Sequence, residues 1–204
     1  MKKRVGILIS GRGSNMRSLI AAAADPAFPA EIELVISNVG NAEGLAFAAK
    51  ADVPTIVIPH KAYDSREAFD RAVDQALVNA DIDIVCLAGF MRILSSWFAR
   101  RWEGRLLNIH PSLLPLFKGV HVHEQVLHAG VRVSGCTVHF VVPELDAGAI
   151  IAQAAVPVEI GDTPETLATR VLVEEHKLYP AALKLLAEGR VRLENGHAVF
   201  TSVV

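Results

Sequence analysis

Short apolar runs alternate with longer amphipathic stretches along the first half of the chain. Runs of strand length, rich in β-branched residues, lie at 5–10, 33–37, 55–58, 84–88 and 106–110. Between them, 66–79 carries Phe69, Val73 and Leu77 four residues apart, which is the spacing of one helix face. Helices alternating with strands that are apolar on both faces indicate a parallel sheet covered on both sides. We therefore predict an α/β fold with a doubly wound, mostly parallel, Rossmann-like sheet in roughly the first 110 residues.

The second half has longer strand candidates at 136–142 and 150–158, separated by a turn-like segment. Thr163 and Pro164 then mark a helix start. We expect this helix to run to about Tyr179, where Pro180 would kink or end it. Asn195-Gly196 predicts a hairpin between 190–194 and 198–204. These mixed or antiparallel strands are expected to extend the same sheet.

The composition is that of one globular domain. The 204 residues are 51% hydrophobic and 21% charged, which excludes a disordered chain, and they contain neither a repeat nor a linker. The net charge is −2 with scattered basic residues, so we expect no nucleic-acid or membrane partner. No apolar run approaches a membrane span, and no signal cleavage site follows the first strand. We expect a cytoplasmic protein in which Cys86 and Cys136 are buried thiols.

A glycine-rich turn, Ser-Gly-Arg-Gly-Ser-Asn at 10–15, joins the first strand to the first helix. Backbone N–H groups at such a helix start suit a phosphate, whereas the alternative is a tight connection without a ligand. Met16 stands where the dinucleotide fingerprint requires a third glycine, and the Lys-Ser/Thr pair of a P-loop is missing. We therefore predict a monophosphate ester held by Gly13, Ser14 and Asn15.

Asn108 and His110 lie where a strand gives way to a loop, the place at which open α/β sheets bind ligands. Alternation along a strand puts both on the same side, where an amide and an imidazole can hold an oxyanion and move a proton. Asp146, in a turn, is a candidate partner for the imidazole. The competing interpretations are a histidine capping a strand end and an aspartate that only forms a turn.

Four more histidines crowd into the same third of the chain. His121 and His123 invite a zinc interpretation, but two histidines at this spacing without cysteines make a weak metal signal. We expect no metal, a polar lining of the cleft by some of His121, His123 and His139, and exposure of His128.

Four motifs occur in order and at familiar spacing: Ser-Gly-Arg-Gly-Ser-Asn at 10–15, Gly-Phe-Met-Arg-Ile-Leu at 89–94, Asn-Ile-His-Pro-Ser-Leu-Leu-Pro at 108–115 and Glu-Leu-Asp-Ala-Gly at 144–148. Through them the chain resembles the folate-dependent formyltransferases over essentially all 204 residues. The first motif and the compact length make it most similar to the phosphoribosylglycinamide formyltransferases.

The resemblance implies a single formyltransferase domain, with a phosphate-binding half (1–110) and a half containing the folate loop (111–204). It implies transfer of a formyl group from 10-formyltetrahydrofolate to the amine of glycinamide ribonucleotide, in purine synthesis, by a monomer or homodimer without a metal. It also implies catalysis by Asn108, His110 and Asp146, and contact of the glycinamide substrate with Glu175 besides the glycine turn. The implied folate site comprises Arg66, Met91, Arg92, Ile93, Leu94, Asn108, Val142, Pro143, Glu144, Leu145 and Asp146.

Two positions depart from the family pattern. Val142 stands where relatives often carry a polar residue, which puts a side-chain hydrogen bond to the pterin in doubt, and Ala149 replaces a frequent proline. Neither position belongs to the catalytic set.

Three alternatives remain open. A formyltetrahydrofolate hydrolase would share the chemistry but carry an N-terminal regulatory domain, whereas this chain begins at its first strand. A methionyl-tRNA formyltransferase would add a basic C-terminal domain, for which the charge and length give no sign. A non-catalytic nucleotide-binding module would use the glycine turn but not the Asn-His-Asp set.

Overall fold

The sheet has seven strands in the computed structural model, which describes residues 1–201, and their order is β3-β2-β1-β4-β5-β6-β7. The strands are β1 (Lys3–Ile9), β2 (Ala30–Ser37), β3 (Thr55–Val57), β4 (Ile84–Leu87), β5 (Leu106–His110), β6 (Val133–Phe140) and β7 (Ile150–Pro157). The first five pair in parallel, and β6 and β7 add antiparallel strands at one edge. The predicted doubly wound, mostly parallel sheet is confirmed. Its order reverses between β1 and β4, so the ligand crevice is expected at the carboxyl ends of these strands.

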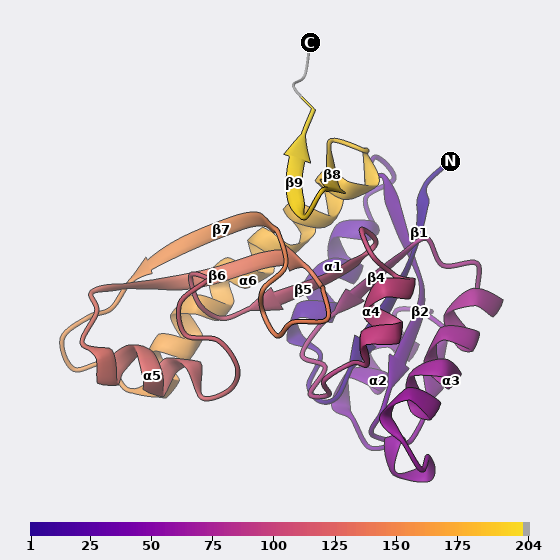
Figure 1. The fold of residues 1–204 in the computed structure, drawn as a ribbon, viewed down its shortest axis with the longest axis horizontal. Coiled ribbons are helices and arrows are strands. Elements are labelled where there is room, and N and C mark those ends of the chain that lie inside the picture. Colours follow the sequence, from indigo (N-terminus) through magenta and orange to yellow (C-terminus); the bar gives the residue numbers. More distant parts are fainter. Residues whose placement is uncertain (202–204) are drawn as a thin grey trace.

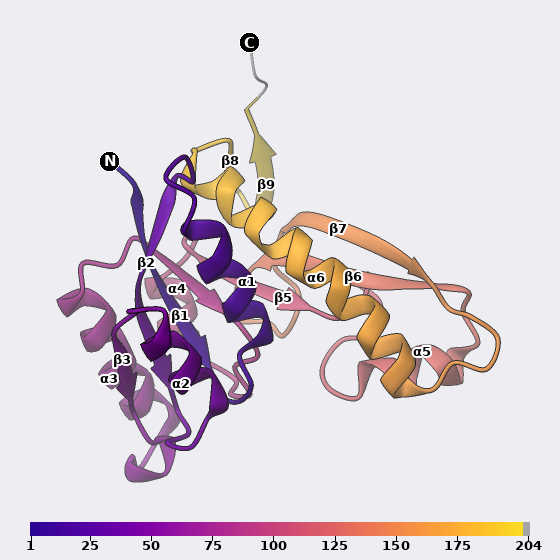
Figure 2. The same cartoon turned by 180° about the vertical axis from the view of Figure 1, so that it is seen from behind.

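Helices cover both faces of the sheet. In Figure 1, α3 (Arg66–Asn79) and α4 (Ser96–Arg101) lie in front of it, with the short 3-10 helix η1 (His60–Ala62) leading into α3. Figure 2 shows the opposite face, which is covered by α1 (Ser14–Ala23), α2 (Glu43–Lys50) and the long α6 (Pro164–Ala187). The far end of the molecule contains α5 (Val122–Ala129), which packs with α6 and the ends of β6 and β7. No helix within residues 1–201 is long and apolar enough to cross a membrane.

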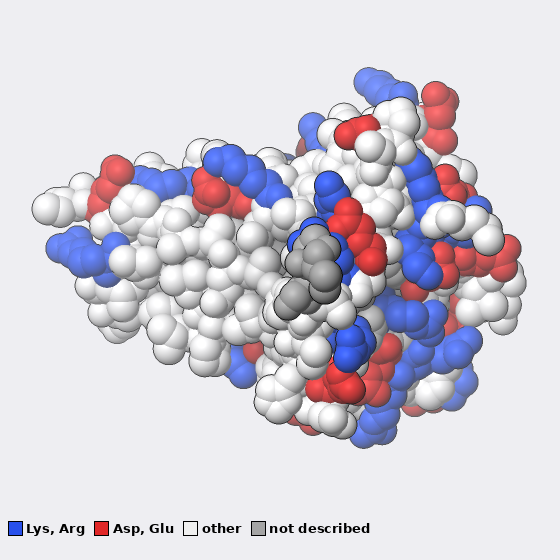
Figure 3. All heavy atoms as spheres, turned by 90° about the horizontal axis from the view of Figure 1, so that it is seen from above, with Lys and Arg blue, Asp and Glu red and all other residues white. Residues whose placement is uncertain are grey.

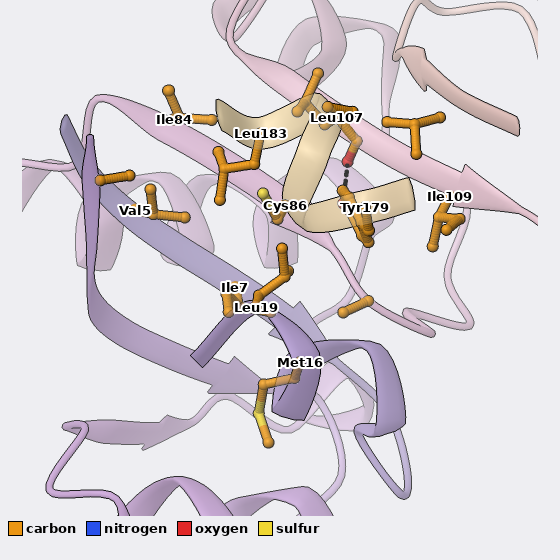
Figure 4. Packing of buried hydrophobic residues seen from close by; sticks show 14 of the residues in the cluster. Val5, Ile7, Met16, Leu19, Ile84, Cys86, Leu107, Ile109, Tyr179 and Leu183 are labelled. Atoms are coloured by element: carbon orange, nitrogen blue, oxygen red, sulfur yellow. Dashed lines mark hydrogen bonds between the residues drawn. The ribbon is translucent and has the colours of Figure 1, made fainter. Parts of the chain in front are cut away.

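The core between the sheet and α6 is tied together by Tyr179. This side chain is fully buried, and its hydroxyl lies 3.0 Å from the Leu87 carbonyl and 3.2 Å from the Leu107 carbonyl. Figure 4 shows the hydroxyl directed at Leu107, with Cys86 beside it. The contact holds α6 against the end of β4 and against Leu107 of β5, the residue before Asn108.

Both cysteines are free and buried, as predicted for structural thiols. Burial raises the pKa of each thiol to about 12, so neither Cys86 nor Cys136 is a reactive thiolate.

The end predicted for the long helix near Tyr179 is wrong. Thr163 caps it as expected, but α6 continues through Pro180 to Ala187. Ala182 and Leu183 are fully buried in the core beyond the proline, and this packing offsets the lost backbone hydrogen bond.

The expected C-terminal hairpin forms, but its placement in the main sheet is wrong. β8 (Val191–Glu194) and β9 (His197–Phe200) pair only with each other, around Asn195 and Gly196 at positive φ. α6 is about 36 Å long at 1.5 Å per residue and carries the chain from beside α5 to the other end of the molecule, where β8 and β9 lie (Figure 2). The last part of the predicted strand 198–204, residues 202–204, lies outside the described residues.

Candidate functional site

Asn108 and His110, two residues apart on β5, point to the same side of the sheet, as alternation predicts. Asn108 is paired in register with His139 on the antiparallel strand β6. The Asn108 amide nitrogen, Nδ2, lies 3.2 Å from His139 Nε2. His139 is therefore the residue that orients the candidate oxyanion donor.

His139 is a neutral acceptor in this contact. It is 2% exposed, and burial lowers the pKa of its imidazole. Its Nδ1 lies 2.8 Å from the Phe140 carbonyl, which requires the proton on Nδ1 and leaves Nε2 to accept from Asn108. The sequence placed His139 only among possible lining residues, because its pairing with Asn108 depends on the register of two strands far apart in the chain.

Both ring nitrogens of His110 face hydrogen-bond acceptors. Nε2 lies 2.8 Å from the Phe117 carbonyl, and Nδ1 lies 3.5 Å from Oδ2 of Asp146. The imidazole of His110 is thus held between a backbone carbonyl and a carboxylate.

Asp146 is aimed at His110 by the conformation of its loop. It adopts φ of 48°, a left-handed conformation that Asp and Asn tolerate better than other side chains. Oδ2 accepts a hydrogen bond from Gly119 N–H at 2.8 Å, and Oδ1 lies 4.0 Å from His139 Nε2. Two residues on, a Cβ at Gly148 would collide with the Phe140 carbonyl, so the loop packs this closely against β6 only with glycine. Asp146 therefore forms the turn and also contacts His110, so it is not only a turn residue.

The other three histidines in this third of the chain differ in their exposure to solvent. His121 is exposed on the solvent side at the start of α5, and His128 is exposed as expected. His123 is half-buried, and its pKa is lowered by burial and, more weakly, by the charge of the neighbouring His110. Within residues 1–201 no group of three His, Cys, Asp or Glu is arranged to hold a metal ion.

The glycine turn starts α1 and is packed tightly. Gly13 caps the helix at φ of 68° without a side-chain cap, so the first N–H groups of α1 are not used by a capping side chain. A Cβ at Gly13 would lie 3.2 Å from the Cα of Gly44, so both glycines permit this approach of the turn to α2. Met16, at the position of the missing third glycine, is fully buried in the core. The turn thus presents a free helix N-terminus on a rigid support.

Asn15 and Glu175 are 160 residues apart in the sequence but are in contact in the structure. The resemblance had assigned them separately to the same substrate. Asn15 Nδ2 donates to Glu175 Oε2 at 2.7 Å, and both side chains are buried. Burial raises the pKa of Glu175, partly offset by this hydrogen bond. Oδ1 of Asn15 is buried with no hydrogen-bond partner among residues 1–201. The pair joins the turn to α6 and leaves an acceptor oxygen free.

The segment 89–94, after β4, exposes two apolar side chains. Met91 is 76% and Ile93 55% exposed, so neither side chain belongs to the core. Leu94 packs partly against the core under α3, and the Arg92 guanidinium lies 5.9 Å from the Phe69 ring. Exposed apolar residues beside a strand end are typical of a ligand slot.

The loop after β6 carries most of the other candidate folate residues. Leu145 is 54% exposed, and Val142, Pro143 and Glu144 line a hollow of about 280 Å³ against α4. The exposed Arg66 lies at the start of α3. Burial raises the pKa of the nearby Asp70, which the sequence did not single out. Hydrogen bonds with Ser95 oppose the rise, and the charges of Arg66 and Arg92 oppose it more weakly.

Comparison with known proteins gives a consistent result. The formyl transferase family model matches residues 3–183. The chain is 43% identical over 192 residues to the phosphoribosylglycinamide formyltransferase of Escherichia coli, covering 94% of this chain and 91% of that protein. Among solved structures, glycinamide ribonucleotide transformylase 1 from Symbiobacterium toebii superposes with a TM-score of 0.96 at 44% identity, covering 98% of this chain and 95% of that one.

A higher identity is found within much longer proteins. The trifunctional purine biosynthetic protein adenosine-3 of Bos taurus is 59% identical over 196 residues, which are 96% of this chain and 19% of that protein. The chain therefore spans about a fifth of the length of these relatives.

Proposed function

Because this chain belongs to the formyl transferase family, we propose that it transfers a formyl group from 10-formyltetrahydrofolate to the primary amine of glycinamide ribonucleotide. The observation that carries the proposal is the convergence of Asn108, His110 and Asp146 at one end of the sheet. This end lies close to the point between β1 and β4 where the strand order reverses and the glycine turn begins. We infer that the enzyme works in the cytoplasm on these small molecules, as a monomer or homodimer.

The substrate phosphate is assigned to the N–H groups of Gly13, Ser14 and Asn15, where the α1 dipole favours an anion. Glu175 is assigned to the glycinamide portion, because its carboxylate is held at the turn by Asn15. A buried acceptor near the amine helps to keep that amine in place for attack.

The folate is assigned to the slot between 89–94 and the loop after β6. Met91, Ile93 and Leu145 supply exposed apolar surface for the pterin, and Arg66 supplies a cation for the carboxylates of its glutamate. The remaining assigned residues are Arg92, Leu94, Val142, Pro143 and Glu144, with Asn108 and Asp146 at the reacting end.

The reaction forms one C–N bond and breaks another. The amine of glycinamide ribonucleotide attacks the formyl carbon, whose oxygen becomes an alkoxide in a tetrahedral intermediate. The bond from this carbon to N10 of the folate then breaks, and the proton lost by the amine passes to N10. One N–H of Asn108 is engaged by His139, so its second N–H is the donor we assign to the alkoxide.

His110 supplies positive charge beside the same oxygen. We expect its Nε2–H to exchange the Phe117 carbonyl for the formyl oxygen when substrates bind, while Asp146 retains the Nδ1 side. The carboxylate then stabilises the imidazolium and orients it, and the pair moves the proton towards N10.

One assay separates this function from its rivals. The release of tetrahydrofolate from 10-formyltetrahydrofolate is followed with and without glycinamide ribonucleotide, and the formylated ribonucleotide is measured. We expect turnover only with the ribonucleotide, one product per folate released. Release of formate without the ribonucleotide would indicate a hydrolase, and binding of both ligands without turnover would indicate a non-catalytic module.

A further inference from the structure

Ser10, the residue before the glycine turn, is hydrogen-bonded to the loop that carries the candidate folate residues. Its backbone N–H donates to the Gly89 carbonyl at 3.1 Å, and its Oγ accepts from the Met91 N–H at 2.8 Å. Ser10 and Met91 are 81 residues apart but follow the adjacent strands β1 and β4. The segment 89–94 is thus attached to the residue from which the glycine turn begins.

A second residue holds the Ser10 hydroxyl in one orientation. The O–H donates to Asn38 Oδ1 at 2.6 Å, and Asn38 is 5% exposed just beyond the end of β2. The Asn38 amide nitrogen in turn lies 3.0 Å from Nδ1 of His60. Because the hydroxyl proton is directed at Asn38, the lone pairs of Oγ remain available to the Met91 N–H.

The glycine turn is fixed on its other side by α2. The Gly44 N–H donates to the Gly11 carbonyl at 3.1 Å, and a Cβ at Gly44 would lie only 3.4 Å from the Cα of Gly13. The turn therefore has no room to move towards α2. Because Ser10 is bonded to both Gly89 and Met91, it fixes the segment 89–94 relative to the turn.

We propose that Ser10 is a positioning residue that holds the segment 89–94 at a set distance from the glycine turn. The inference rests on the proposed function, which places the phosphate on the turn and part of the folate site on the segment 89–94. Direct attack requires the amine and the formyl carbon to approach within about 3–3.5 Å. Each reactant is bound at one end of the connection made by Ser10. The Ser10 hydroxyl therefore sets whether the distance between the two binding sites suits direct attack.

The test is Ser10→Ala, which removes the hydroxyl but keeps the backbone bond to Gly89. We expect the KM for 10-formyltetrahydrofolate to rise roughly 2- to 13-fold, as for one lost hydrogen bond. The affinity for tetrahydrofolate, measured by calorimetry, should fall by the same factor. The affinity for glycinamide ribonucleotide should change by less than about twofold, since the N–H groups of the turn remain. Ser10→Thr restores a hydroxyl at the same position and should restore folate affinity.

Two further variants make the result specific. Ser18→Ala removes a hydroxyl that bonds only within α1, to the Asn15 carbonyl at 2.8 Å, and should leave folate affinity unchanged. Asn38→Ala removes the partner that orients Ser10 and should weaken folate binding in the same direction, by a smaller factor.

The proposal is overturned by an unchanged tetrahydrofolate affinity in Ser10→Ala. It is also overturned by equal losses of affinity for both ligands, which would indicate general loosening of the fold. A wild-type chain that binds tetrahydrofolate without formylating the ribonucleotide would contradict the proposed function alone, and the calorimetric comparison of the variants would still decide the role of Ser10.

Discussion

Nδ1 of His110 lies 3.5 Å from Oδ2 of Asp146, and the two side chains are only 5% and 8% exposed. A carboxylate so shielded from water acts on a neighbouring imidazole more strongly than one at the surface. The charge on Asp146 is therefore expected to act on the chemistry through His110 and not only on the loop.

Asp146→Asn should lower kcat roughly 10²- to 10³-fold, with little change in either KM. The variant keeps the shape of the side chain, and Asn tolerates the positive φ at this position, so the turn should survive. Steady-state kinetics over a range of pH are the measurement, and the pH profile of kcat should change along with its height. A rate and profile near those of the wild type would reduce Asp146 to a turn residue.

The same experiment has an internal control for cooperation. Asn108→Ala, His110→Ala and Asp146→Ala should each show a loss of similar size. The double variant His110→Ala/Asp146→Ala should be hardly slower than the poorer single variant, because residues that act as a unit are not additive.

Glycinamide ribonucleotide should bind at least about tenfold more tightly than its riboside, because charge-assisted hydrogen bonds to a phosphate are strong. Calorimetry on both compounds measures the difference. Gly13→Ala should reduce it, since a Cβ there strains the positive φ and presses on Gly44. Equal affinities for the two compounds would contradict the assignment of the phosphate site to Gly13, Ser14 and Asn15.

Ile93→Asp should weaken tetrahydrofolate binding by roughly tenfold or more, since it puts a charge against an apolar pterin, and leave ribonucleotide affinity nearly intact. Because Ile93 is 55% exposed, the variant is expected to fold. Titration with each ligand, together with a melting curve, is the measurement. Unchanged folate binding in a folded variant would place the pterin elsewhere.

Glu175→Gln should change the pH dependence of stability. Burial raises the pKa of Glu175, so the folded state prefers its neutral form; this contribution to stability is present at low pH and is lost as pH rises through the raised pKa. Relative to the wild type, the Gln variant should gain stability between pH 4 and pH 8 in urea unfolding, while its KM for the ribonucleotide rises. Parallel stability curves for the two proteins would contradict this account.

His139→Gln should make the enzyme less sensitive to acid. Burial lowers the pKa of His139, so the folded state holds it neutral and stability is lost as pH falls below about 6.5, the unfolded value. Protonation also removes the acceptor that orients Asn108, whereas Gln keeps an acceptor oxygen. Between pH 8 and pH 5, the free energy of unfolding and kcat should both fall less steeply in the variant than in the wild type. Equal slopes for the two proteins would show that His139 does not control this pH dependence.

The sequence by itself determined the class of fold, the five strands and the helix 66–79 of the first half, and the family resemblance, all of which are confirmed. Local patterns sufficed because period, caps and breakers act within a few residues: α3 and β5 have the predicted bounds. The candidate residues of the site were also named from sequence, and their roles remain predictions.

Only the tertiary structure decided the contacts between distant segments. Asn15 meets Glu175 because α1 packs beside α6. Asn108 meets His139, and Ser10 meets Met91, because of strand order and register, which no local pattern encodes. For the same reason α6 passes through Pro180, and the last hairpin leaves the main sheet, since burial of Leu183 and the length of the helix outweigh local preference.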